Sequence, residues 1–187
     1  YAVYWLWHED SEYTEKAVFE SDISADELTV ENKHLKVLFD DKTGGIKSLV
    51  TKADGVEYVG GDFCIPTVVD NTEPDTWAHN IFKFDKVIGK MTLKSFELVE
   101  NGPARAVVRV KHIYGNSYLT QDFVLDTDSK LLRVKCRVLW QEPLTIFKMP
   151  VTVDGDNPIS TYEIPAGYIK RPCNGEEEPA LTWGDIT

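Results

Sequence analysis

The chain has 187 residues, of which 42% are hydrophobic and 27% are charged, a composition typical of one folded domain with a sizeable core. Its formal net charge of −11 cannot neutralise the phosphates of a nucleic acid, and anionic lipid surfaces would repel it. No apolar run in the sequence approaches the roughly 20 residues of a membrane span. We therefore expect no nucleic-acid and no membrane partner, which leaves neutral sugars, cations and proteins.

The first residues, 1–7, are apolar and aromatic and predict a strand that starts without a polar leader. Residues 7–26 are rich in Glu, Asp and Ser, which is typical of a solvated linker or a long loop. The last residues, 183–187, stop without a tail. We therefore expect a fragment of a longer chain, with an opening strand and acidic linker at 1–26 and a β-sandwich domain, truncated at both ends, at 27–187.

From residue 28 onward the sequence predicts successive strands separated by turns. The segment 40–44, Asp-Asp-Lys-Thr-Gly, lies between two apolar runs and predicts a hairpin turn, in which glycine supplies the positive φ of a tight connection. The predicted strands are 28–30, 34–39, 45–49, 64–69, 82–88, 91–98, 104–114, 117–125, 131–140 and 146–153.

The later strands alternate between apolar and charged residues. Ala106 and Val108 alternate with Arg105 and Arg109, and the segment 132–139 repeats the pattern. A period of two with one apolar face indicates antiparallel strands that are covered on one side. Turn sequences recur at intervals of about ten residues, and no stretch with a helical period interrupts them. The sequence thus predicts an all-β fold, a large antiparallel β-sandwich.

The three cysteines, Cys64, Cys136 and Cys173, are widely spaced and odd in number. This pattern favours reduced, structural thiols over a disulfide framework or a close-spaced zinc site. The sequence also lacks the charged and then apolar start of a signal peptide. Together these features predict a cytoplasmic location.

Residues 71–80 predict a long surface loop with the composition of a sugar site. Asp75, Trp77 and His79 lie within it. Aromatic rings stack on the apolar C–H faces of sugars, while carboxylates and amides bind the hydroxyl groups. The alternative is a structural loop, in which Trp77 fills the edge of a core and Asp75 closes a turn through its own backbone.

Residues 165–179, which contain several Gly and Pro residues, predict a second long surface loop. Arg171 offers a planar fork of five donors that suits a carboxylate or vicinal hydroxyl groups. The alternative is that Arg171 pairs with an acidic neighbour and only locks the loop.

Other chemistries have less support in the sequence. His8, His34, His79 and His112 show no short ligand spacing, so we expect no metal site built wholly within this chain. There is no Gly-rich phosphate loop and no Gly-x-Ser-x-Gly elbow. Carboxylate pairs could be chosen freely among 31 acidic residues, so we assign no catalytic residue.

Three segments resemble one family of glycoside hydrolases. Residues 28–49 contain Glu-Asn before a strand, then a Thr-Gly turn and Ile-x-Ser-Leu. This order resembles the start of the C-terminal β-domain of family 38 α-mannosidases. Similar starts occur in other galactose mutarotase-like sandwiches. Residues 75–79, Asp-Thr-Trp-Ala-His, look like the Asp-x-Trp loop of these enzymes. Residues 162–172 are similar to their Tyr-Glu-Ile-Pro-x-Gly-x-Ile-x-Arg-Pro segment. The resemblance covers nearly the whole chain.

The resemblance implies a retaining α-mannosidase whose zinc, aspartate nucleophile and acid/base carboxylate lie in an N-terminal catalytic domain. A retaining mechanism needs its two carboxylates about 5 Å apart, so the fragment alone is expected to be inactive and to hold no cofactor itself. Its β-domain is expected to support the catalytic domain and to line the substrate cleft. The residues implied to contact an α-mannoside or oligosaccharide are Asp75, Trp77, His79, Tyr162 and Arg171.

Three alternatives stay open. The chain could be an autonomous carbohydrate-binding domain, or a mutarotase-like sugar epimerase on the same fold. An epimerase would need a His and a carboxylate facing each other across one pocket. A purely structural piece would instead expose an apolar patch of several hundred Å² for docking.

Overall fold

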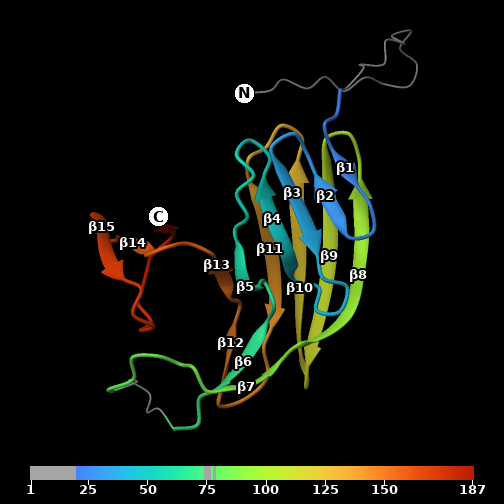
Figure 1. Ribbon diagram of the computed structural model, residues 1–187. Coiled ribbons are helices and arrows are strands. Elements are labelled where there is room, and N and C mark those ends of the chain that lie inside the picture. The colour runs from blue at the N-terminus through green and yellow to red at the C-terminus, as the bar shows by residue number, and fades with distance from the viewer. Residues whose placement is uncertain (1–19, 74–76, 78) are drawn as a thin grey trace, which may run out of the picture.

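Two antiparallel sheets form the body of the molecule, whose computed structural model describes residues 20–73, 77 and 79–187. Their strands are β1 (Ser24–Ala25), β2 (Thr29–Glu31), β3 (Leu35–Phe39), β4 (Ile46–Thr51), β8 (Thr92–Asn101), β9 (Arg105–Tyr114), β10 (Ser117–Asp126) and β11 (Leu132–Leu139). The first sheet has the order β1-β2-β3-β4 and the second the order β11-β10-β9-β8. Figure 1 shows the two sheets stacked as layers.

The core lies between the two layers because the apolar positions of each alternating strand face inward. Val37 and Phe39 from β3 pack with Val108 from β9 and Phe123 from β10, and all four are buried. The rings of Phe39 and Phe123 meet edge to face with centroids 5.1 Å apart. Burial of each such side chain contributes about 1.5–3 kcal/mol, so this interface is a main source of stability. The predicted all-β sandwich is confirmed.

The predicted hairpin turn at 40–44 is also present, between β3 and β4. The Asp40 carboxylate accepts hydrogen bonds from the backbone N–H groups of Lys42 and Thr43, at 2.8 and 2.9 Å. Gly44 follows with φ +69°, the left-handed conformation that the sequence anticipates there. The Thr43 carbonyl accepts a hydrogen bond from the buried His112 Nε2 at 2.7 Å, so β9 of the opposite sheet holds the turn.

The remaining strands extend the sandwich at one side. Their bounds are β5 (Val59–Phe63), β6 (Thr67–Asp70), β7 (Val87–Lys90), β12 (Thr145–Lys148), β13 (Val151–Val153), β14 (Ile159–Ile164), β15 (Gly167–Pro172) and β16 (Gly184–Ile186). They pair as β12-β6-β7, β13-β5 and β15-β14-β16. We call the last group the C-terminal sheet, and Figure 1 shows it apart from the two layers, beyond β13.

Two predicted strands differ from the observed ones because the chain changes partners within them. The segment 146–153 is divided by Pro150, which has no N–H for a ladder, so β12 pairs with β6 whereas β13 pairs with β5. The segment 82–88 is a strand only from Val87, because the backbone of Phe82 and Phe84 bonds to Glu177 rather than to another strand.

The prediction of a long loop at 165–179 is wrong for residues 167–172, which form β15. β14 and β15 make a hairpin with a two-residue turn, in which Ala166 takes a φ of +65°. β15 lies at the edge of the C-terminal sheet and ends at Pro172, a position where proline removes no ladder hydrogen bond. Gly167 and Pro172 therefore suggested a loop, although they are the first and last residues of an edge strand.

The predicted strand at 1–7 and most of the acidic linker lie outside the described residues. At the end of the linker, Ser24–Ala25 forms β1 and pairs with β2. The described part of the chain holds no helix with the length and apolar character to span a membrane.

Candidate functional site

The connection between β6 and β7, which we call the 71–86 loop, encloses a hollow of about 260 Å³. Its charged groups are paired: Lys86 Nζ lies 2.7 Å from an Asp70 oxygen and 3.3 Å from a Glu73 oxygen, and Lys83 Nζ lies 2.7 Å from an Asp85 oxygen. The lining residues are Asp70, Glu73, Ile81, Lys83, Phe84, Asp85 and Lys86.

Two of these pairs favour the ionised form of a carboxylate. A hydrogen bond from Lys86 lowers the pKa of Asp70, and a hydrogen bond from Lys83 lowers the pKa of Asp85. A general acid in glycoside hydrolysis needs a raised pKa instead, so neither residue is suited to donate a proton. The Asp85 side chain is 63% exposed and can accept a hydrogen bond from a hydroxyl group, whereas the Asp70 side chain is only 13% exposed and is bound by Lys86.

The structure brings Tyr162 and Arg171 together on the C-terminal sheet. The Arg171 guanidinium lies 5.7 Å from the centroid of the Tyr162 ring. It also donates to a Glu178 oxygen at 2.7 Å and to the Pro179 carbonyl at 3.1 Å, and only 18% of its side chain is exposed. The ion pair with an acidic neighbour, which the sequence left as one of two possibilities for Arg171, is thus present. Contact of either residue with a sugar stays a prediction.

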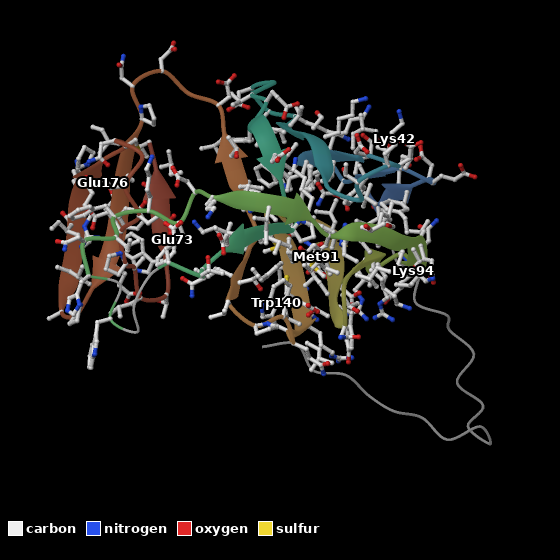
Figure 2. The ribbon with its side chains drawn as sticks, turned by 90° about the horizontal axis from the view of Figure 1, so that it is seen from below. Lys42, Glu73, Met91, Lys94, Trp140 and Glu176 are labelled. Atoms are coloured by element: carbon white, nitrogen blue, oxygen red, sulfur yellow. The ribbon has the colours of Figure 1, made fainter. Side chains whose placement is uncertain are left out.

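One residue, Glu177, connects the 71–86 loop with the segment that follows β15. Its backbone N–H donates to the Phe82 carbonyl at 2.8 Å, and its carboxylate accepts from the Phe84 N–H at 2.6 Å. Lys148 of β12 bonds to the same carboxylate and to the Phe84 carbonyl. Figure 2 shows Glu73 of the loop and Glu176 of the tail at the same end of the molecule, away from Lys42 and Lys94. Residues 82–84 of the 71–86 loop are therefore in direct contact with the segment that follows β15.

Both the 71–86 loop and the C-terminal sheet expose aromatic side chains. Trp77 of the 71–86 loop is 80% exposed, and Phe82 of the same loop and Tyr168 of β15 are also largely exposed. Trp183, just before β16, is 44% exposed. Exposed aromatic rings are a common feature of surfaces that recognise ligands.

The predicted site residues are only partly accounted for. Asp75 lies outside the described residues. Trp77 is exposed and does not fill the edge of a core, and His79 is exposed beside it in the loop. The sequence did not predict the contacts of Glu177, because Glu177 and Phe84 are 93 positions apart and only the fold brings them together.

His112 does not form the pair that an epimerase needs. It is fully buried, its Nε2 donates to the Thr43 carbonyl, and its Nδ1 has no hydrogen-bond partner among the described residues, so neither nitrogen contacts a carboxylate. Burial lowers the pKa of His112, which keeps the ring neutral. His112 is thus a core residue, and it offers no support for the epimerase alternative.

The described residues do not fit a zinc site. Within them, no three His, Cys, Asp or Glu side chains lie close enough together to hold a metal ion. A ligand set from this part of the chain alone would need at least three such groups.

The comparison with protein families agrees with this fold. Residues 30–187 match the model of the family described as "Glycosyl hydrolases family 38 C-terminal domain". A search of curated proteins gave no match. The matched range spans both sheets of the sandwich and the C-terminal sheet, and the chain therefore belongs to the family of glycosyl hydrolase family 38 C-terminal domains.

Proposed function

We propose that this chain is the non-catalytic β-sandwich of a retaining, zinc-dependent α-mannosidase, and that it lines the substrate cleft of that enzyme. The observation that carries the proposal is the surface at which the 71–86 loop meets the segment after β15 through the bonds of Glu177. The exposed rings of Trp77 and Phe82 and the exposed carboxylates of Glu73 and Asp85 belong to this loop.

Each part of this surface has a role in recognition of an α-mannoside or oligosaccharide. Trp77 and Tyr168 offer flat faces for the C–H side of a pyranose ring. Glu73 and Asp85, whose side chains are exposed, accept hydrogen bonds from its hydroxyl groups. The pKa of Asp85 is lowered by Lys83, so Asp85 does this over a wide pH range. Asp75, His79, Tyr162 and Arg171 are proposed to contact the same ligand.

The chemistry is proposed to lie in an N-terminal catalytic domain of the same polypeptide. Zinc bound there would supply the fixed positive charge that orients sugar hydroxyl groups, and its ligands would come from that domain. The role of the present chain is to exclude water from one side of the cleft and to orient the sugar. A cytoplasmic location belongs to the same proposal and is supported by the free thiols of Cys64, Cys136 and Cys173.

The first experiment is hydrolysis of an aryl α-mannoside with zinc supplied, by this chain and by the full-length parent enzyme. We expect turnover by the parent and none by the chain. Turnover by the chain itself would refute the proposal, because its catalytic residues would then lie among residues 1–187.

A second experiment tests the surface. Trp77→Ala in the parent enzyme is expected to raise KM for an oligosaccharide about tenfold, since loss of one stacking contact costs about 1–1.5 kcal/mol. Tyr118→Ala, which removes an exposed ring on β10 outside this surface, is the matched control and leaves KM unchanged. Equal effects of both variants would contradict the assignment of this surface.

A carbohydrate-binding module that works without a catalytic domain is the second candidate, and the exposure of Trp77 favours it. This candidate predicts sugar affinity in the isolated chain that is lost in Trp77→Ala. Calorimetry with α-mannosides distinguishes the two, because a cleft wall alone binds too weakly to detect.

A further inference from the structure

The second sheet of the sandwich ends on one side at β11, which pairs only with β10 among the described strands. No hydrogen bond described for this part of the chain reaches the outward backbone groups of Leu132–Leu139. An edge strand presents alternate N–H and C=O groups to solvent, ready to pair with another strand. We call this free side the β11 edge.

The inward side of β11 is apolar, and the opposite layer covers only its first half. Val134 packs against the core, whereas Cys136 is exposed and Val138 is 42% exposed. Met149 contacts this side of β11, with its sulfur 3.9 Å from the Cys136 sulfur. The second half of β11 thus leaves apolar side chains exposed at the edge of the sheet.

The outward side of β11 is cationic. Lys135 and Arg137 line a hollow of about 360 Å³ with Arg109 and Lys111, in which Asp122 is the one lining carboxylate. The Asp122 carboxylate is bound by Arg109 through two hydrogen bonds of 2.7 and 2.8 Å. Within the described residues, Lys135 and Arg137 form no ion pair. A strongly acidic chain therefore carries unneutralised positive charge at this edge.

These charges disfavour the pairing of two β11 strands from two copies of the chain. In an antiparallel pair of two β11 strands centred on Lys135, Arg133 of one copy would face Arg137 of the other, and like charges placed directly opposite are destabilising. The same positive side chains attract a strand that carries carboxylates at alternate positions.

We propose that the β11 edge binds an added strand, an extended segment of a partner protein in which apolar residues alternate with Asp or Glu. The backbone of the segment pairs with β11, as in other cases of strand addition. Its apolar side chains cover Cys136 and Val138. Its carboxylates lie beside Lys135 and Arg137.

The test uses a synthetic peptide of alternating Val and Glu, of the same length as β11, titrated onto the chain. Amide hydrogen exchange is expected to slow in β11 on addition of the peptide. β8, the opposite edge of the same sheet, carries Glu97 and Glu100 and is expected to exchange as before. A peptide of the same composition without the alternation, and one with methylated backbone nitrogens, are expected to leave β11 unchanged.

Charge reversal tests the recognition. The double variant Lys135→Glu and Arg137→Glu is expected to weaken binding roughly tenfold, since two exposed ion pairs are replaced by repulsion. Lys94→Glu on β8 reverses an exposed charge at the other edge and leaves the affinity unchanged. Unaltered exchange in β9 and β10 of each variant shows that the sheet is folded.

Three results would overturn the proposal. The first is an unchanged exchange rate in β11 at saturating peptide. The second is equal protection by the peptide without alternation. The third is dimerisation of the chain through β11, detected by sedimentation, which would make a second copy the occupant.

Discussion

Gly44 in the turn between β3 and β4 allows a quantitative test of the packing between the two sheets. An alanine Cβ at this position would lie 2.4 Å from Val110 Cγ1 and 2.8 Å from Leu93 Cδ1. Alanine at a φ of +69° costs about 1 kcal/mol in backbone strain, and overpacking costs about 1–3 kcal/mol more. Gly44→Ala is therefore expected to lower the free energy of unfolding by about 2–4 kcal/mol.

Gly55 provides the matched control, because it has a similar φ of +74° and no atom within 4 Å of an added Cβ. Gly55→Ala is expected to cost only the strain, about 1 kcal/mol. Urea unfolding followed by fluorescence measures both variants, and the m-value shows that each unfolds in the same way. Equal losses at Gly44 and Gly55 would refute the argument, because the turn would then not press against β8 and β9.

Three further predictions concern buried groups. Asn32 donates to two carbonyls at 3.0 and 2.8 Å and accepts from two N–H groups at 2.9 and 2.8 Å, so Asn32→Ala is expected to cost about 2–4 kcal/mol. Asn32→Asp keeps the accepted bonds but sets a buried carboxylate oxygen against the two carbonyls, so it is expected to cost at least as much, and a smaller cost than that of Asn32→Ala would contradict this. Burial lowers the pKa of His112 below its ordinary 6.5, so its contribution to stability is complete above that pH and is lost as the pH falls below it. The pH dependence of unfolding should flatten between about pH 7 and pH 5 in His112→Leu, and an unchanged slope would exclude this group. Burial raises the pKa of Cys64 to about 12, so mass spectrometry after alkylation of the native protein is expected to find Cys173 and Cys136 modified and Cys64 intact until unfolding.

The body of the fold could be predicted from the sequence because its strands alternate with a period of two. The inward residues of β9 and β10, such as Val108 and Phe123, are buried as their spacing indicates. The C-terminal sheet was missed because the sequence offers Gly167 and Pro172 where the strand begins and ends, and both residues usually mark loops. Only pairing with β14 makes this segment a strand.

Composition drew attention to Trp77 and Arg171, and the family resemblance nominated them as site residues, but neither indicated what surrounds them. The fold adds the contact that unites their two segments, since Glu177 meets Phe84 across 93 residues of sequence. Pairing of Arg171 with an acidic neighbour was one of the two possibilities that the sequence left open, and the fold identifies this neighbour as Glu178. Local patterns contain no information on distant pairs such as Glu177 and Phe84.

The position of Glu177 has a consequence for the order in which parts of the molecule open. Its carboxylate is shared by a loop, a tail and β12, so release of the tail also frees the Phe84 N–H and the Lys148 ammonium group. The loop and the tail are therefore expected to open together, as one cooperative unit whose free energy is below that of global unfolding. By linkage, any ligand that holds one of the two segments also stabilises the other.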